Sequence, residues 1–536
     1  MTEKVIVSLK EGQIRGIKQS SKFSGAEFYS FFGIPYGKPP IDSLRFKDPL
    51  KAKPWKGIYD ATEEKSGCIQ FSYLTYEILG SENCLFNNIH TPKLPGKNDT
   101  LKPVIINIHP GAYTFGSPHT KAFGSPEFIM HNDVVYVGIA HRLNILGFLN
   151  LGLKECSGNQ GIKDILLSLQ WIRENIRSFG GDPDNITLVG SSSGSEVIHV
   201  LMLAPAAKGL FHKAVLMGAY IFNPPVYHTE TNEQFAREIA MDLDYDGNLQ
   251  DNKKLLQFLK KQPAVLLLEG ARRCQKKLHQ NIVPTLPIGV FSPSIDGGNI
   301  LPKTPRKLIE SMARIPTMVG FSQIESAIGF TGEMKPFTEK NFKNSLRQNC
   351  FGWGHHISDD DLRLIYKEVE EFYLDGQPVE QASQATKMDI QTDIILSGIY
   401  DGVINPIASD LPSSVFVYKF EFQGNLHSNG IVKIFLTGDP GKGSFHTSDH
   451  CYWNRLNDPG DKETHQMIQT FTKLVTTFAR NGDPNFEAIQ VKWKPTTVDN
   501  PCYFSIKNPL EMVDGKLNND RLNFWQNIQK KFGREN

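Results

Sequence analysis

The sequence lacks any long apolar run, and its charges nearly cancel. Its 536 residues contain 58 Lys and Arg against 57 Asp and Glu, which leaves a formal net charge of +1. This balance argues against a protein that binds nucleic acid or acidic membranes through its overall charge. The longest apolar clusters, such as Val134–Ala140, have the length of a strand rather than the about 18 residues of a membrane-spanning helix. We therefore expect no nucleic-acid partner and no membrane span.

Cysteine is also scarce, with seven residues in the whole chain. None of them form a CxxC pair, so a structural zinc site is not expected. Nothing in the sequence indicates another metal or an organic cofactor, and we predict none. The odd count predicts mostly free thiols with at most a few disulfide bridges.

The N-terminal sequence MTEKVIVSLKEGQIRG lacks the apolar segment of a signal peptide. If Met1 is the native start, this predicts a cytoplasmic protein. A secreted protein would be expected only if a signal peptide had been removed. A monomer is the default expectation.

No repeat, low-complexity tract or linker divides the chain, so we expect one domain over residues 1–536. Strand and helix patterns alternate through the first 220 residues, and a more helical, irregular stretch follows from about 225 to 400. This alternation predicts an α/β fold with a large central sheet, mixed but mostly parallel, that is flanked by helices. The strands expected from the apolar patterns are Val104–Ile108, Val134–Ala140, Ile186–Val189, Thr317–Gly320 and Val415–Phe422. The helices are Asp164–Phe179 and Glu196–Leu203, with a turn over residues 180–185 between Phe179 and the next strand.

The sharpest local signal is the pentapeptide of residues 190–194, which fits G-x-S-x-G with Ser192 at its centre. In this pattern a tight strand–turn–helix corner lifts the serine hydroxyl clear of the sheet, and the two glycines let strand and helix approach. A flexible Gly/Ser loop would show the same letters. A predicted strand precedes the motif and a predicted helix follows it, which favours a nucleophilic Ser192.

A serine nucleophile needs a base, a group that orients the base, and donors for the developing oxyanion. The segment His109-Pro110-Gly111-Ala112 follows a predicted strand, where such donors are expected. Gly111 and Ala112 have free N–H groups, whereas Pro110 has none. The N–H of Ser193 would be the third donor. Alone, this segment would be read as an ordinary Pro-Gly turn.

Short sequence motifs along almost the whole chain resemble those of the type-B carboxylesterase/cholinesterase family of α/β-hydrolases. Within the family, the resemblance is strongest to the intracellular insect-type carboxylesterases. The motifs comprise Phe32–Tyr36 with Pro39-Pro40 and Leu44–Phe46, Ser81–Leu85, Gly158–Gly161, Trp171-Ile172, Asn175-Ile176, Phe179–Pro183, Gly209–His212, Asp296-Gly297 and Asn481–Pro484. The resemblance implies an α/β-hydrolase fold and a serine hydrolase that cleaves carboxylic esters through an acyl-enzyme. Its substrate would be a small-molecule ester, in xenobiotic or lipid-ester metabolism.

The resemblance also assigns the remaining catalytic roles. The family's acid lies five residues after a strand-end glycine, which is Gly320 here and makes Glu325 the acid. Its base lies in G-x-x-H with an acidic residue three positions on, which matches Gly443, His446 and Asp449. His450 is a nearby rival without the glycine. The order Ser192, Glu325, His446 is that of an α/β-hydrolase.

Four positions depart from the family pattern. Ser191 stands where a Glu is usual, Ser193 replaces Ala, Pro110 replaces the first loop glycine, and Met217-Gly218-Ala219 replaces Met-Ser-Gly. None removes a triad atom, so they predict altered efficiency or substrate choice. Cys68 and Cys84 match the family's first disulfide.

Two other functions fit the resemblance. A non-catalytic binding protein can use the same fold, although such relatives usually lose a triad residue. A slow esterase could instead sequester ligands or organophosphates by reacting once with Ser192.

Overall fold

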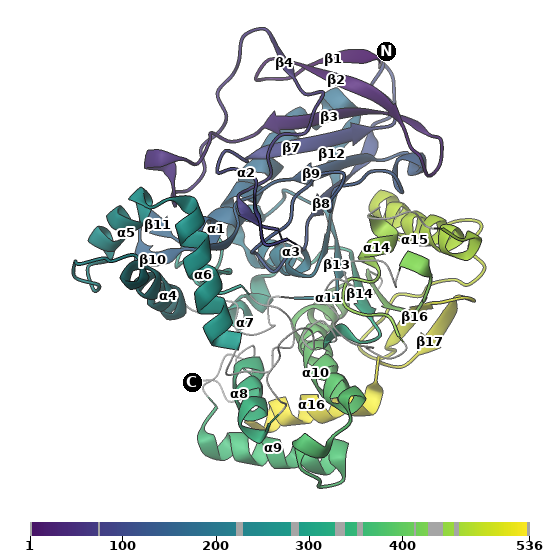
Figure 1. Cartoon of the computed structure of the whole chain (residues 1–536). Helices are drawn as coiled ribbons and strands as arrows, with labels where there is room; N and C mark the ends of the chain where they lie inside the picture. Colours follow the sequence, from purple (N-terminus) through teal and green to yellow (C-terminus); the bar gives the residue numbers. More distant parts are fainter. Residues whose placement is uncertain are drawn as a thin grey trace.

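The computed structural model describes residues 3–72, 75–220, 229–279, 289–326, 338–350, 357–411, 414–426, 443–454 and 460–532. Its centre is a 13-stranded sheet (Figure 1). The strands from β9 to β16 are parallel, and those outside them pair antiparallel except for β4, which lies parallel to β2. The order across the sheet is β1 (Lys4–Ser8), β2 (Gln13–Ser20), β3 (Glu27–Pro35), β7 (Phe86–Thr91), β9 (Val135–Ile139), β8 (Lys102–Ile108), β12 (Gly181–Ser191), β13 (Lys213–Met217), β14 (Thr317–Ser322), β15 (Val415–Phe420), β16 (Cys502–Ile506) and β17 (Glu511–Asp514), with β4 (Ile58–Asp60) beside β2.

Helices flank this sheet and form a separate group around α8, α9, α10 and α16 (Figure 1). Two small hairpins, β5 (Gln70–Phe71) with β6 (Ile78–Leu79) and β10 (Asn150–Leu153) with β11 (Cys156–Ser157), lie outside the main sheet. The helices are α1 (Asn144–Phe148), α2 (Gln160–Asn175), α3 (Ser193–Leu203), α4 (Thr229–Asp242), α5 (Asn252–Lys261), α6 (Ala264–His279), α7 (Pro305–Leu308), α8 (Glu339–Cys350), α9 (Asp359–Leu374), α10 (Gln384–Ile399), α11 (Asn405–Asp410), α14 (His450–Trp453), α15 (Lys462–Asn481) and α16 (Asn519–Phe532).

The alternation of strand side chains places one hydrophobic core on each face of the sheet. On β8, Ile106 belongs to the core that α2 and α3 cover, whereas the neighbouring Ile105 belongs to the core that α15 covers. On β13, Leu216 and Met217 divide in the same way. Parallel strands covered on both faces are apolar along their whole length, and the predicted mixed, mostly parallel sheet is confirmed.

The predicted elements differ from the structure mainly at their ends. Helix α2 begins at Gln160, four residues before the predicted start, and the short 3₁₀ helix η3 (Ile176–Phe179) completes it. Gly180 caps this helix with a φ of 81°, as predicted. The turn predicted for the rest of 180–185 is wrong, because β12 already begins at Gly181. A shift in register between Gly181 and Ile186 absorbs these turn-forming residues within the strand.

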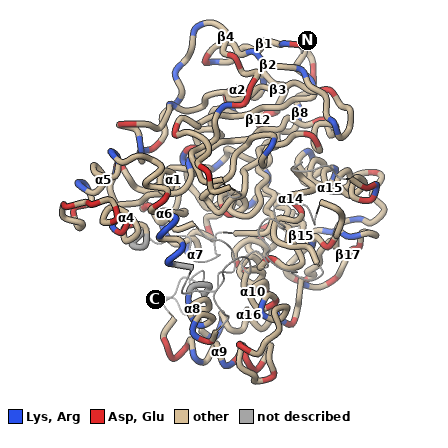
Figure 2. Tube along the Cα trace, in the orientation of Figure 1, with Lys and Arg blue, Asp and Glu red and all other residues tan. Residues whose placement is uncertain are grey.

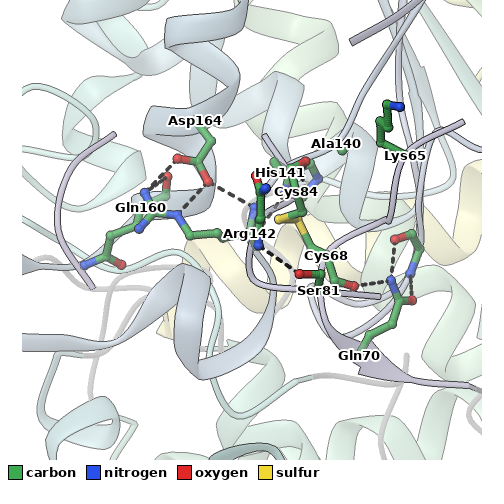
Figure 3. The surroundings of a disulfide bond; sticks show 12 residues. Lys65, Cys68, Gln70, Ser81, Cys84, Ala140, His141, Arg142, Gln160 and Asp164 are labelled. Carbon is green, nitrogen blue, oxygen red and sulfur yellow. Dashed lines mark hydrogen bonds and ion pairs between the residues drawn. A yellow bond between two sulfur atoms is a disulfide. The ribbon is translucent and has the colours of Figure 1, made fainter. Parts of the chain in front are cut away.

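The structure contains the disulfide between Cys68 and Cys84, and both residues are buried (Figure 3). The bridge joins residues 16 positions apart. A loop of this length contributes about 3 kcal/mol to the free energy of unfolding. Four other cysteines are buried as free thiols: Cys156, Cys274, Cys451 and Cys502.

Charged residues of both signs occur over most of the molecule, with basic residues gathered along α6 and acidic ones along α9 (Figure 2). None of the helices in the described ranges is both long and apolar enough to cross a bilayer.

Candidate active site

Ser192 lies at the corner between β12 and α3, at the carboxyl edge of the parallel strands. Its φ of 53° and ψ of −130° place it outside the usual regions for a residue with a side chain. A Cβ atom on Gly190 would lie 2.6 Å from the carbonyl carbon of Gly194, and one on Gly194 would lie 2.2 Å from the carbonyl oxygen of Ile108. The corner closes only because both positions are glycine, which is the predicted reason for the G-x-S-x-G pattern.

The structure brings Ser192 together with His446 and Glu325, which follow it by 254 and 133 positions in the sequence. His446 Nε2 lies 2.8 Å from Ser192 Oγ, and His446 Nδ1 lies 2.6 Å from Glu325 Oε2. His446 and Glu325 are buried, with side chains 1% and 0% exposed, whereas Ser192 is partly exposed. A buried carboxylate that accepts from Nδ1 leaves Nε2 free to accept the serine proton.

Two loops carry the acid and the histidine, and hydrogen bonds between these loops fix the positions of the two side chains. The loop after β14 carries Glu325, whose Oε1 accepts the N–H of Ser322 at 2.5 Å. This loop pairs with the histidine loop through Ser444, whose Oγ accepts the N–H of Gln323 at 2.8 Å and whose carbonyl accepts that of Ile324 at 2.9 Å. Because these bonds involve the backbone, the sequence pattern gave no sign of them.

Gly218 makes room for the contact between the acid and the histidine. It follows β13 with a φ of 73°, and its N–H donates to the carbonyl of Gly320. A Cβ atom here would lie 3.0 Å from Glu325 Oε2 and 3.1 Å from His446 Nδ1. A side chain here would therefore lie directly against this acid–histidine pair, and the glycine removes the polar group that the usual serine of the family would place there.

The loop after β8 has the conformation expected of an oxyanion loop. Gly111, Ala112 and Tyr113 all have positive φ values, of 129°, 51° and 62°. Within the described part of the chain, the N–H groups of Gly111, Ala112 and Ser193 donate no hydrogen bond to other protein groups. Ser193 is the first residue of α3, where the helix dipole adds positive potential. The three predicted donors therefore remain available to a ligand.

Two contacts that the sequence did not indicate fix this oxyanion loop. Tyr113 donates its hydroxyl to Glu196 of α3, which ties the loop to the helix after Ser192. Gln70, in the loop that the disulfide closes, donates from Nε2 to the carbonyl of Gly116 at 2.9 Å, and its Oε1 accepts the N–H of Gly116 at 2.6 Å. The disulfide-closed loop therefore supports the far end of the oxyanion loop.

The rival His450 is not part of this hydrogen-bonded series. It begins α14, and its Nε2 lies 3.3 Å from the amide nitrogen of Asn454. Burial lowers the pKa of His450 to about 3. This neutral, enclosed ring is a structural residue of the core beside the candidate site.

Asp449 supplies a second carboxylate behind the histidine. Its Oδ2 accepts the hydroxyl of Tyr418 at 2.6 Å and its Oδ1 accepts the N–H of His450 at 2.8 Å. Burial and, to a smaller extent, the nearby Glu325 raise the pKa of Asp449 to about 6. Tyr418 fits here because Gly320 has no side chain, since a Cβ atom there would lie 1.8 Å from the tyrosine ring.

The raised pKa of Asp449 predicts a pH-dependent effect on stability. Because the folded protein holds this proton more tightly than the unfolded chain, the group destabilises the fold as the pH rises from about 4 to 6, and the effect is complete above 6. Asp449→Asn removes the titration. The free energy of unfolding of this variant, taken relative to that of the original chain, should rise by about 2 kcal/mol between pH 4 and pH 8. Urea unfolding at several pH values measures this, and a difference independent of pH would contradict it.

Ser191, the main departure from the family pattern, has a buried hydroxyl without a hydrogen-bond partner among the described residues. No carboxylate therefore stands beside Ser192 at this position.

The fold and the site together define a serine hydrolase of the α/β-hydrolase class: a nucleophile corner after a central parallel strand, a histidine–carboxylate pair after later strands, and free backbone donors opposite. The chain belongs to the carboxylesterase family, whose model matches residues 3–525. The resemblance found in the sequence is thereby confirmed.

Relatives in the family are named as esterases. Esterase E4 of Myzus persicae is 30% identical over 92% of this chain and 88% of its own length. Juvenile hormone esterase of Heliothis virescens is 33% identical over 60% of this chain and 57% of its own length. The crystal structure of juvenile hormone esterase from Manduca sexta, with OTFP covalently attached, superimposes with a TM-score of 0.84 at 26% identity, covering 98% of this chain and all of that one. The protein is a carboxylic ester hydrolase, and the non-catalytic and sequestering alternatives are not favoured.

Proposed function

We propose that Ser192, His446 and Glu325 are the catalytic triad of this ester hydrolase. The observation that carries the proposal is the continuous series from Ser192 Oγ to His446 Nε2 at 2.8 Å and from His446 Nδ1 to Glu325 Oε2 at 2.6 Å. Ser192 Oγ attacks the ester carbonyl while His446 takes its proton. Glu325 fixes the ring and stabilises the imidazolium that forms.

The N–H groups of Gly111, Ala112 and Ser193 would bind the oxyanion of the tetrahedral intermediate. This intermediate collapses to an acyl-enzyme, and His446 returns its proton to the leaving alcohol. Water then attacks the acyl group with His446 again as base, which releases the carboxylate and restores Ser192. One such donor is typically worth about 10²–10³ in kcat. Pro110 carries no N–H, but it is not one of the three proposed donors.

We further propose that the substrates are uncharged, moderately apolar esters. The carboxylates that the structure describes around the site are all engaged: Glu325 by His446, Asp449 by Tyr418 and Glu196 by Tyr113. Ser191 supplies none. Among the residues that the structure describes, this arrangement leaves no free carboxylate beside the nucleophile to hold a cationic alcohol group.

Hydrolysis of p-nitrophenyl butyrate by the purified chain, compared with butyrylcholine, tests both proposals. We expect turnover of the first ester with an acyl-enzyme burst, stoichiometric labelling by a fluorophosphonate, and a much lower kcat/KM for the choline ester. Comparable values for both esters would refute the proposed substrate class. Labelling without turnover would indicate sequestration. If folded protein shows neither labelling nor turnover, the proposed triad is refuted. A monomeric state, the absence of a nucleic-acid partner and the cytoplasmic location stay predictions.

A further inference from the structure

A surface groove lies away from Ser192, between the segment around the 3₁₀ helix η1 (Asp42–Leu44) and the β10–α5 part of the chain. Its volume is about 670 Å³, within the range of ligand sites. Figure 1 shows α5 beside β10 and β11. Three leucines, Leu44, Leu50 and Leu153, supply apolar walls, and Leu50 is 44% exposed to solvent.

The rim of this groove is positively charged. Lys47, Lys154 and Lys253 line it together with two carboxylates. Asp48 forms an ion pair with Lys163 at 2.7 Å. Glu155 forms ion pairs with Lys260 at 3.0 Å and with Lys47 at 3.8 Å.

Lys154 and Lys253 form no ion pair with any residue in the described ranges. The nearest carboxylate of the lining, Glu155, is paired with Lys260 and acts on Lys253 only through its field. The rim therefore presents two ammonium groups without a carboxylate at ion-pair distance, beside partly exposed leucine side chains.

Two arginines fix the walls of the groove: Arg45, which is partly exposed, and Arg142, which is buried. Arg45 donates from Nη1 to the carbonyls of Lys260 and Gln262, at 2.8 and 2.7 Å, which ties η1 to the end of α5. Arg142 donates from Nη1 to the carbonyl of Lys47 at 2.7 Å. Arg142 is itself locked in a buried ion pair with Asp164 at 2.7 Å (Figure 3). A groove held in this way exists before a ligand arrives, which lowers the cost of binding.

We propose that this groove binds an aliphatic carboxylate, with its chain on the three leucines and its head group at Lys154 and Lys253. The apolar walls favour a hydrocarbon chain over a small inorganic anion. The unpaired ammonium groups favour a negative head over a neutral one. Ester hydrolysis releases a carboxylate, so the reaction of this protein itself generates ligands of this class. The proposal does not depend on which esters are cleaved.

Isothermal titration with laurate, after Ser192 has been blocked by a fluorophosphonate, tests the groove separately from the acyl site. We expect binding to persist in the blocked protein and to weaken as salt rises, since the charges are exposed. Lys154→Gln with Lys253→Gln should weaken it about tenfold. Leu50→Glu, at an exposed position, should weaken it at least as much. The matched control is Lys56→Gln with Lys492→Gln, two exposed lysines outside the groove, which should leave the affinity unchanged.

Any of four results would overturn the proposal. Laurate binding could be lost when Ser192 is blocked, or the affinity for laurate could stay unchanged in Lys154→Gln with Lys253→Gln. Dodecanol could bind as tightly as laurate, or the control variant could weaken laurate binding. A further experiment measures binding of the protein to vesicles of phosphatidylcholine and phosphatidylserine. Binding to these vesicles that depends on Lys154 and Lys253, without binding of monomeric laurate, would identify the groove as a membrane contact instead.

Discussion

Replacing Ser192 with alanine should lower kcat for p-nitrophenyl butyrate by about 10⁵–10⁶-fold, and a residual rate about 10³–10⁴-fold above the uncatalysed one should remain. The variant loses the only oxygen that His446 Nε2 contacts in the series described above, at 2.8 Å. KM should change little, because the oxyanion donors and the substrate site remain. Fluorophosphonate labelling, followed by intact mass, should vanish in the same sample.

The neighbouring serine offers a matched control for this variant. Ser191 Oγ is buried and has no hydrogen-bond partner among the described residues, so Ser191→Ala removes no bond and leaves the corner intact. We expect its kcat to stay within about threefold of the original value, since only an unpaired hydroxyl is lost. Equal losses in the two variants would show that the corner, rather than the Ser192 hydroxyl, is what activity requires.

Replacing Glu325 with glutamine should lower kcat by about 10⁴-fold while the protein still folds. The carboxylate accepts from His446 Nδ1 at 2.6 Å and from the N–H of Ser322 at 2.5 Å. A glutamine that keeps the backbone bond presents its amide N–H₂ to the ring. The histidine then takes the tautomer whose Nε2 is protonated, and that nitrogen can no longer accept the proton of Ser192.

Asp449→Asn is the appropriate comparison for this second prediction. Asp449 is a buried carboxylate behind the same histidine, but it binds Tyr418 and the N–H of His450 rather than the ring of His446. Initial rates and the rate of fluorophosphonate labelling should both fall steeply in Glu325→Gln and far less in Asp449→Asn. A similar loss in both variants would mean that the total buried charge, and not the orientation of the ring, governs the rate.

The local part of the site was readable from the sequence. A strand, G-x-S-x-G and a helix in succession predict the corner at Ser192, because only glycine fits where a Cβ would meet the backbone of Gly194 or Ile108. The position of Gly111 and Ala112 after a strand likewise predicts backbone donors. Glu325 and His446 came from family resemblance, since a Glu and a His 121 positions apart show no local pattern that pairs them.

Other contacts became visible only in the folded chain. Tyr418 donates to Asp449 across the space that Gly320 leaves open. Gln70, in the disulfide-closed loop, forms hydrogen bonds with Gly116. Gly218 leaves space for the carboxylate of Glu325. Each depends on backbone positions that the sheet register sets, and that register is fixed by distant partners. The groove with Leu50 and Lys253 likewise joins segments 203 positions apart in the chain.

The sequence by itself determined the α/β class, the corner at Ser192 and the family, because hydrophobic period, glycine placement and motif order are properties of short segments. Only the tertiary structure decided how closely His446 approaches Ser192 and Glu325, which groups hold the loop of Gly111 and Ala112, and that Lys154 and Lys253 share one rim. Distances between residues far apart in the chain follow from how helices cover the sheet, and no single segment contains that information.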